Sequence, residues 1–332
     1  MKNSYKCAVM ALIFSALSTT VQAKTTLKVA ATVPVGTPWA DHLIEWKENV
    51  ESASGGEIEL EFFLGGQLGN EYDVYRQVQR GRIDIGWFTG AVMAENVPEI
   101  ALMSTPFFFR ESKTLDCVYG GKFGDQLATY VSEDGVKMLQ WQETGWVSII
   151  AKDDLSDVEA AKGYKARVAP QPMSRTLWSS VGANVSEIPY MEMPSALQTN
   201  LIKSGETAAI SYFAFGLDKV APHYIRTRHL HQAGAILINQ GVWDKLSAEQ
   251  QAVLEQGLPD LQAHRDSMRK LTEEVLAKYN DKSGNVHELT DAQYAAWKAK
   301  VEPNWPNFVN ELGERPQSIW PDLIKAKAAC EN

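Results

Sequence analysis

The chain has 332 residues, of which 45% are hydrophobic and 22% charged, and its formal net charge is −9. An acidic protein without any basic run is poorly suited to nucleic acid, so the charge argues against that class of partner. The length exceeds what a single hydrophobic core usually organises, and no Ser/Gly-rich or Pro-rich linker divides the chain. We therefore expect two lobes joined by several crossings of the chain.

The first 23 residues have the features of an export signal. Two lysines precede a short apolar run at 8–17, and the Val-Gln-Ala sequence at 21–23 supplies small residues for cleavage after Ala23. Cys7 lies before the apolar run, which is the wrong place for a lipid-anchored cysteine. Cleavage would remove Lys2 and Lys6 with the signal, so the mature chain would keep 30 of the 32 basic residues and all 41 acidic ones. No later segment is long and apolar enough to cross a membrane, so we expect an exported, periplasmic protein without direct membrane insertion.

Strand and helix patterns alternate at the start of the predicted mature chain. Residues 58–64 alternate between apolar and polar, as in a strand with one buried face, whereas the apolar residues of 39–50 recur at helical spacing. This order predicts a mostly parallel sheet with helices on its faces. Strands are expected at 26–31, 58–64 and 83–88, and helices at 39–50 and 71–80.

The alternation continues through the rest of the chain. Ser247 and Gln250 form a capping-box pattern before a long helical run that extends to Tyr279. We expect lobe I to comprise 24–150 plus about 235–290, lobe II to comprise 151–234, and the Trp- and Pro-rich tail, 291–332, to wrap over the lobes as helices and turns. Further strands are expected at 136–141, 146–151, 164–168, 185–188, 207–212 and 229–238, and helices at 174–181 and 194–202.

Arg167 is the leading candidate for a ligand-binding residue. It lies on a short strand that ends before a proline, and ligands of open α/β sheets bind at the carboxyl ends of strands. A guanidinium can hold a carboxylate through two parallel hydrogen bonds, which fixes both its charge and its orientation. The alternative is a structural or surface ion pair. We favour a cleft with Arg167 on one wall and the strand end at Trp87 and Thr89 on the other.

Several other residues are candidates for the walls of this cleft. Glu71 begins a helix after a glycine-rich loop, where it either complements the helix N-terminus or receives an ammonium or hydroxyl group of the ligand. Aromatic side chains pack in cores by default, and adjacent Trp87 and Phe88 must point to opposite faces of their strand. The remaining aromatic candidates are Trp146, Tyr212 and Phe213.

The cysteine and histidine residues suggest no catalytic or metal centre. Cys117 and Cys330 either form a disulfide in an oxidising compartment or remain free thiols. His229 and His231 are two residues apart on a predicted strand, but no third metal ligand is evident. Hydrolase, metalloprotease, phosphate-loop and dinucleotide-binding motifs are absent from the sequence. We therefore expect a binding protein without a metal or cofactor, rather than an enzyme.

Short motifs along the chain occur in the order found in one family of bacterial receptors. They are Gly66-Gln67-Leu68-Gly69, 77–84 (QVQRGRID), 106–110 (PFFFR), 163–168 (GYKARV), Gly182-Ala183-Asn184 followed by Glu192, 196–199 (ALQT) and 242–247 (VWDKLS). Each motif alone is weak evidence, but together they extend over nearly the whole predicted mature chain. On these residues the chain resembles the solute-binding proteins of tripartite ATP-independent periplasmic (TRAP) transporters, of the dicarboxylate-binding-protein type.

The resemblance implies an α/β, two-lobe periplasmic-binding-protein fold with mixed, mostly parallel sheets and a long helix linking the lobes. It implies that Arg167 binds the carboxylate of a small organic acid and that Tyr190 lines the site. It also implies that the cleft closes on the ligand, which is then delivered to the small and large subunits of an ion-gradient-driven membrane permease. The alternatives are a binding component of another uptake or sensing system and, less favoured, a secreted α/β enzyme.

The sequence also departs from the family pattern where the ligand is expected to bind. Val147 replaces a second arginine that many members carry, and the run at 203–207 (KSGET) lacks an asparagine that often helps to hold the carboxylate. Both changes remove polar contacts, while aromatic residues are frequent nearby. We therefore predict that the ligand is not a standard C4-dicarboxylate, and that it is a monoacid or a zwitterion whose cationic end lies on aromatic faces.

Overall fold

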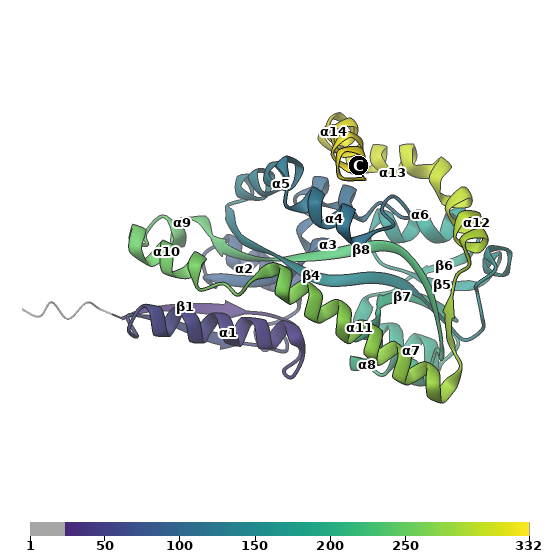
Figure 1. Cartoon of the computed structure of the whole chain (residues 1–332), viewed down its shortest axis with the longest axis horizontal. Helices are drawn as coiled ribbons and strands as arrows, with labels where there is room; N and C mark the ends of the chain where they lie inside the picture. Colours follow the sequence, from purple (N-terminus) through teal and green to yellow (C-terminus); the bar gives the residue numbers. More distant parts are fainter. Residues whose placement is uncertain (1–23, 332) are drawn as a thin grey trace, which may run out of the picture.

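The computed structural model describes residues 24–331. The predicted export signal, its cleavage site after Ala23, and Cys7 lie outside the described residues. Figure 1 shows an elongated α/β molecule in which the helices pack on both faces of one large sheet.

Lobe I contains the first three strands, which pair in parallel in the order β2-β1-β3. Helix α1 begins where the sequence predicts, because Thr37 caps its N-terminus and Pro38 occupies the first turn. The elements are β1 (Thr25–Ala30), α1 (Pro38–Ala53), β2 (Ile58–Phe63), α2 (Glu71–Gln79), β3 (Ile85–Thr89), α3 (Gly90–Met93), η1 (Pro98–Ser104), α4 (Ser112–Tyr119) and α5 (Lys122–Glu133).

Two long antiparallel strands, β4 (Val136–Ala151) and β8 (His223–Asn239), run through both lobes. Strand β8 pairs with β3 of lobe I, and β4 pairs with β7 of lobe II, so one sheet has the order β2-β1-β3-β8-β4-β7-β5-β6. The two strands that we predicted at 136–141 and 146–151 are therefore one. The pairing of β4 with β8 has three irregularities, one of which, between Glu143 and Gly145, lies in the segment between the two predicted strands.

Lobe II contains a parallel three-stranded part, in the order β7-β5-β6. The strand predicted at 207–212 exists as β7 but ends at Ala208, because the chain enters a helix at Ala209 and Tyr212 is helical. The elements are η2 (Val158–Ala161), β5 (Lys165–Val168), α6 (Pro172–Ser180), β6 (Asn184–Glu187), η3 (Tyr190–Glu192), α7 (Met193–Gln198), β7 (Ser204–Ala208), α8 (Ala209–Ala214) and η4 (Leu217–Lys219).

A long helix connects the lobes along the two shared strands (Figure 1). The capping box of Ser247 and Gln250 is present as predicted. The single helical run predicted from there to Tyr279 is two helices, since Pro259 cannot continue a helix. The elements are α9 (Gln240–Trp243), α10 (Ala248–Gln256), α11 (Leu261–Ser283) and β9 (Val286–Glu288), which pairs with β8.

The tail is helical and contacts both lobes, in α12 (Asp291–Val301), η5 (Glu302–Asn304), α13 (Trp305–Leu312) and α14 (Glu314–Glu331). Helix α12 packs on η2 and α6 of lobe II, whereas α14 packs on α4 and α5 of lobe I. Cys117 of α4 and Cys330 of α14 form a disulfide, with their Cα atoms 5.9 Å apart. Of the two states that the sequence leaves open for these cysteines, the structure has the paired one.

Apolar clusters lie on both faces of the sheet. In lobe I, Phe88 belongs to the cluster under α3–α5 and α14, and its neighbour Trp87 belongs to the cluster under α1. The opposite orientation of these two rings agrees with the alternation of a strand. Across residues 24–331, none of the helices combines the length and apolar character that a membrane crossing requires.

Candidate functional site

Arg167 lies on β5, and its side chain is buried, with 4% of its surface exposed. Its Nε donates a hydrogen bond to the carbonyl of Ile188 at 2.8 Å, and its guanidinium carbon lies 5.7 Å from the centre of the Tyr190 ring. Burial lowers the pKa of Arg167, and the charge of Glu206 opposes that shift. Within residues 24–331 the guanidinium forms no ion pair and its Nη atoms have no hydrogen-bond partner, so they are available to an anion.

Tyr190 and Thr207 extend the wall of lobe II beside this arginine. The Tyr190 hydroxyl and Thr207 Oγ1 are 2.7 Å apart, and burial raises the pKa of Tyr190 while the Arg167 charge opposes the rise. Sequence reasoning missed Thr207, although it lies within the 203–207 run where the family pattern expects an asparagine. Its position on β7, in the strand next to β5, brings its hydroxyl to the site.

Glu71 lies in lobe I, in the first turn of α2. Its carboxylate accepts a hydrogen bond from the backbone N–H of Thr89, the residue before α3. Burial raises the pKa of Glu71 to about 7, although that hydrogen bond favours the charged form. Near neutral pH this carboxyl can therefore either donate or accept a hydrogen bond. Thr89 contributes its backbone here, and its side chain makes no capping bond.

Tyr72 and Gln171 connect the two lobes. Gln171 Nε2 donates to the Tyr72 hydroxyl at 3.0 Å, which joins α2 of lobe I to the residue before α6 of lobe II. Burial raises the pKa of Tyr72; the Glu71 charge adds to the rise and the Arg167 charge opposes it. The contact therefore brings α2, which carries Glu71, next to the segment between β5 and α6 that follows Arg167. Sequence reasoning did not select either member of this contact.

Apart from Tyr190, none of the predicted aromatic residues forms a hydrogen bond or cation–π contact with Arg167 in the described part of the chain. Trp87 is 3% exposed, and its ring packs 6.4 Å from that of Trp39 in the core under α1. Tyr212 has no exposed surface, and its hydroxyl donates to the carbonyl of Ala221, so in this conformation it offers nothing to a ligand. The ring is a core residue of α8, because the chain is helical there, and a ligand role for Tyr212 stays a prediction.

Two further aromatic candidates contact other parts of the protein. Phe213 packs 5.3 Å from Tyr279 of α11. Trp146 donates its Nε1 hydrogen to Ser112 Oγ at 2.8 Å and lies 5.3 Å from the His231 ring. Val147, which replaces the second arginine of the family pattern, is buried in the large apolar cluster of lobe I. None of these contacts involves Arg167, so a ligand role for Phe213 and Trp146 stays a prediction.

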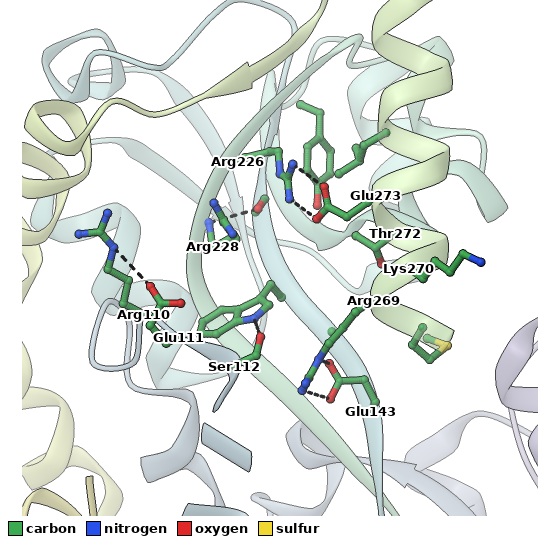
Figure 2. A pocket seen from close by; sticks show the side chains of 16 residues that line it. Arg110, Glu111, Ser112, Glu143, Arg226, Arg228, Arg269, Lys270, Thr272 and Glu273 are labelled. Carbon is green, nitrogen blue, oxygen red and sulfur yellow. Dashed lines mark hydrogen bonds and ion pairs between the residues drawn. The ribbon is translucent and has the colours of Figure 1, made fainter. Parts of the chain in front are cut away.

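A cavity of about 290 Å³ lies at the junction of β4, β8, α11 and residues 110–112. Figure 2 shows the side chains that line it. Arg226 binds Glu273 through both Nη atoms, at 2.9 and 2.5 Å, and Arg269 binds Glu143 at 3.1 Å. Arg167 does not line this cavity. Because these cations already have acidic partners, the cavity is a weaker candidate for an anion site than the unpaired arginine.

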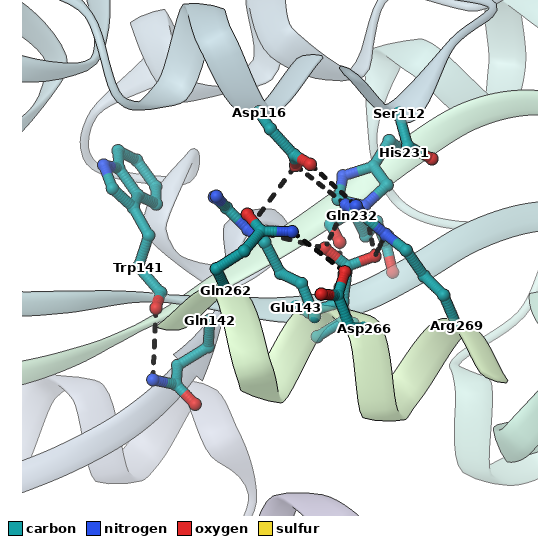
Figure 3. A network of polar contacts seen from close by, with 12 residues as sticks. Ser112, Asp116, Trp141, Gln142, Glu143, His231, Gln232, Gln262, Asp266 and Arg269 are labelled. Carbon is teal, nitrogen blue, oxygen red and sulfur yellow. Dashed lines mark hydrogen bonds and ion pairs between the residues drawn. The ribbon is translucent and has the colours of Figure 1, made fainter. Parts of the chain in front are cut away.

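A buried charge network holds α11 against the shared strands (Figure 3). Glu143 of β4 accepts hydrogen bonds from His231 at 2.9 Å and from Arg269 at 3.1 Å, and Arg269 also binds both oxygens of Asp116. Burial alone would raise the pKa of Glu143, but the His231 and Arg269 interactions outweigh it and lower the pKa to about 2. The network therefore fixes α4, β4, β8 and α11 relative to one another.

The histidines of β8 have protein partners. His229 lies 2.8 Å from Thr227 Oγ1 and 3.2 Å from Glu206 Oε2, and His231 binds Glu143. Among residues 24–331, no three or more His, Cys, Asp or Glu side chains are placed to hold a metal ion together.

Comparison with known proteins identifies the family. The sequence model for bacterial extracellular solute-binding protein family 7 matches residues 29–312. The 2,3-diketo-L-gulonate-binding periplasmic protein of Escherichia coli is 28% identical over 296 residues, which cover 86% of this chain and 87% of that protein.

Two solved structures of TRAP periplasmic solute-binding proteins share the fold. One, from Chromohalobacter salexigens with bound D-glucuronate, has a TM-score of 0.84 at 23% identity and covers 90% of this chain and 99% of its own. The other, from Sulfurospirillum deleyianum with bound succinate, has a TM-score of 0.81 at 26% identity, with 93% and 99% covered. Because the family model spans most of the sequence, this chain belongs to bacterial extracellular solute-binding protein family 7 and is a solute-binding protein of the TRAP-transporter type.

Proposed function

We propose that this protein captures a hydroxylated monocarboxylate, such as a sugar acid, with the carboxylate on Arg167. The observation that carries the proposal is a buried arginine without an ion pair in residues 24–331. A buried charge is stable only when it is paired and hydrogen-bonded, and a ligand carboxylate supplies both requirements. Val147, at the position where the family pattern has a second arginine, is buried and apolar and offers no charge to a second carboxylate.

The opposite wall suits hydroxyl groups. Glu71 has a pKa of about 7 because of its burial, so it can accept a hydrogen bond from a ligand hydroxyl or donate one to it. The phenol of Tyr190 and the hydroxyl of Thr207 add donors and acceptors next to Arg167. The relatives include a binding protein for 2,3-diketo-L-gulonate and one with bound D-glucuronate, both hydroxylated acids.

The proposed transport cycle follows from a site that is divided between the lobes. A ligand that touches Arg167 in lobe II and Glu71 in lobe I binds the closed form better than the open form and therefore shifts the population towards closure. The closed protein would deliver its ligand to the small and large subunits of a TRAP permease. We further propose that the protein works in the periplasm, that its signal is removed after Ala23, and that it does not transform its ligand chemically.

A thermal-shift screen tests the ligand class. D-glucuronate, D-galacturonate, galactonate, succinate, malate and fumarate are each added at the same concentration, since a ligand that binds only the folded protein raises its stability. We expect at least one of the three sugar acids to raise the melting temperature more than any dicarboxylate does. If succinate, malate or fumarate gave the largest rise, the ligand would be a C4-dicarboxylate and the proposal would fail.

The pH dependence of unfolding tests the environment of Glu71. The pKa of Glu71 is raised from 4.5 to about 7 in the folded protein, so its protonated form is favoured by folding. Its contribution to the free energy of unfolding is full below pH 4.5 and is lost as the pH rises to about 7. We expect wild-type stability, relative to Glu71→Gln, to fall by on the order of 3 kcal/mol over that range. Urea unfolding at several pH values measures the difference. The control, Glu48→Gln on the exposed side of α1, should track the wild type.

A further inference from the structure

One hydrogen bond joins side chains of the two lobes directly, without a ligand between them. Gln171 Nε2 donates to the Tyr72 hydroxyl at 3.0 Å, across 99 positions of the sequence. Gln171 stands at the N-cap position of α6, yet its side chain makes no capping bond to that helix. The side chain is directed instead to the other lobe, where it meets the first turn of α2.

Both partners are held by local structure. Gln171 lies between Pro170 and Pro172 in an extended conformation, with φ −144° and ψ 143°, and the flanking prolines restrict the backbone there. Ser174 Oγ also accepts a hydrogen bond from the N–H of Ala169, which fixes the turn behind Gln171. On the other side, Asn70 caps α2 by accepting from Asp73 N at 2.9 Å. The backbone on both sides of the bond is therefore restrained before the two side chains meet, so the remaining entropy cost is that of ordering the side chains.

The bond also lies close to the proposed carboxylate site. Gln171 follows Arg167 by four residues, and the Arg167 and Glu71 charges both act on the Tyr72 hydroxyl. When the lobes separate, the Gln171 amide and the Tyr72 phenol must part and be hydrated. The bond would therefore exist only while the lobes are closed, next to the place that the proposed function gives to the ligand carboxylate.

We propose that the Gln171–Tyr72 hydrogen bond retains the ligand by holding the closed form, and so sets the rate of ligand release. Gln171 and Tyr72 are positioning residues that act through lobe closure and not through contact with the carboxylate. The proposal rests on the proposed function of the Arg167 site. Loss of one neutral hydrogen bond should raise the dissociation rate constant about 2- to 10-fold, with little change in the association rate constant, because binding begins from the open form.

A double-mutant cycle on the full-length mature protein tests this. Stopped-flow fluorescence measures association and dissociation of the tightest-binding acid of the six screened above, for Tyr72→Phe, Gln171→Ala and the double variant. We expect each single variant to release the ligand faster and the double variant to release it no faster than the more affected single one. Unchanged dissociation in both single variants, or fully additive effects, would overturn the proposal.

A matched control is present within lobe I. Gln126 Nε2 donates to the Tyr130 hydroxyl at 2.8 Å inside α5, so Gln126→Ala and Tyr130→Phe remove the same kind of bond away from the lobe junction. These two variants should leave both rate constants unchanged. Equal acceleration by the control variants would show that the effect is general destabilisation, which would reject a role for the interlobe bond.

A ligand-independent readout separates this proposal from the proposed function. Spin labels at exposed Glu48 of α1 and Gln198 of α7, introduced as cysteines, report the distance between the lobes by pulsed electron paramagnetic resonance. Without ligand, the closed-form population should be smaller in Tyr72→Phe and Gln171→Ala than in the parent. If none of the six acids bound, the proposed ligand class would fail, but this comparison would still test the role of the interlobe bond. Equal closed-form populations in the parent and the variants would reject that role.

Discussion

Arg167→Met should weaken binding of the carboxylate ligand by about 10²- to 10⁴-fold, because two charge-assisted hydrogen bonds of about 1.5–3 kcal/mol each are lost. The ligand-free protein should unfold at an unchanged or higher temperature, since the wild-type side chain is a buried charge without an ion pair in the described chain. Isothermal titration calorimetry measures the first effect, and thermal unfolding measures the second. Lost affinity with retained stability would separate ligand binding from a structural role.

Two further variants sharpen this experiment. Arg167→Lys keeps the positive charge but cannot form two parallel bonds, so its affinity should lie between those of the parent and the Met variant. Arg175→Met removes an exposed arginine of α6 that pairs with Glu187 and Glu311, and it should bind like the parent. Parental affinity in both Arg167 variants would show that the carboxylate binds elsewhere.

Glu143→Gln should lower the free energy of unfolding by about 3–5 kcal/mol, as expected when one member of a buried ion pair is removed. The change leaves His231, which is 2% exposed, without its carboxylate and deprives Arg269 of one of its two acids. Guanidinium unfolding followed by circular dichroism measures the loss. The ligand cleft is not part of this network, so binding at saturating ligand should persist in the folded variant.

The pH dependence of the free energy of unfolding provides a second test of the role of Glu143. The pKa of Glu143 is lowered from 4.5 to about 2 in the folded protein, so its contribution is present above pH 4.5 and is lost as the pH falls towards 2. The stability difference between the parent and Glu143→Gln should therefore shrink as the solution is acidified through this range. Glu111→Gln, whose side chain is 74% exposed, serves as the control and should differ little from the parent at any pH. A constant difference across the range would contradict the assigned pKa.

Much of the fold could be predicted because local chemistry determines the ends of the elements. Thr37 with Pro38, and Ser247 with Gln250, begin helices through capping contacts that span only a few residues. The continuity of β4 could not be predicted in the same way. Its alternation is broken wherever the pairing with β8 shifts, and such shifts depend on a partner strand about 90 residues away.

In the candidate site, too, local features could be predicted from the sequence and long-range contacts could not. Arg167 could be selected from the sequence because a strand end, a proline and a family motif coincide there. Gln171 and Tyr72 meet only when the lobes are assembled, and neither residue type indicates a partner 99 positions away. Tyr212 illustrates a second limit: this aromatic residue is near the site in sequence, and the structure buries it fully in the core. Composition indicates that aromatic residues will be buried, but not against which surface.

The sharing of β4 and β8 by both lobes limits how such a receptor can be recombined. A fragment of residues 151–234 would contain β5, β6, β7 and part of β8, but β7 and β8 would both lack their neighbour β4, and bare strand edges would be exposed. Neither lobe could therefore be expressed alone or replaced by the corresponding lobe of a relative. New specificities must arise by substitution of side chains within one indivisible sheet, and selection on ligand choice must act on the chain as a whole.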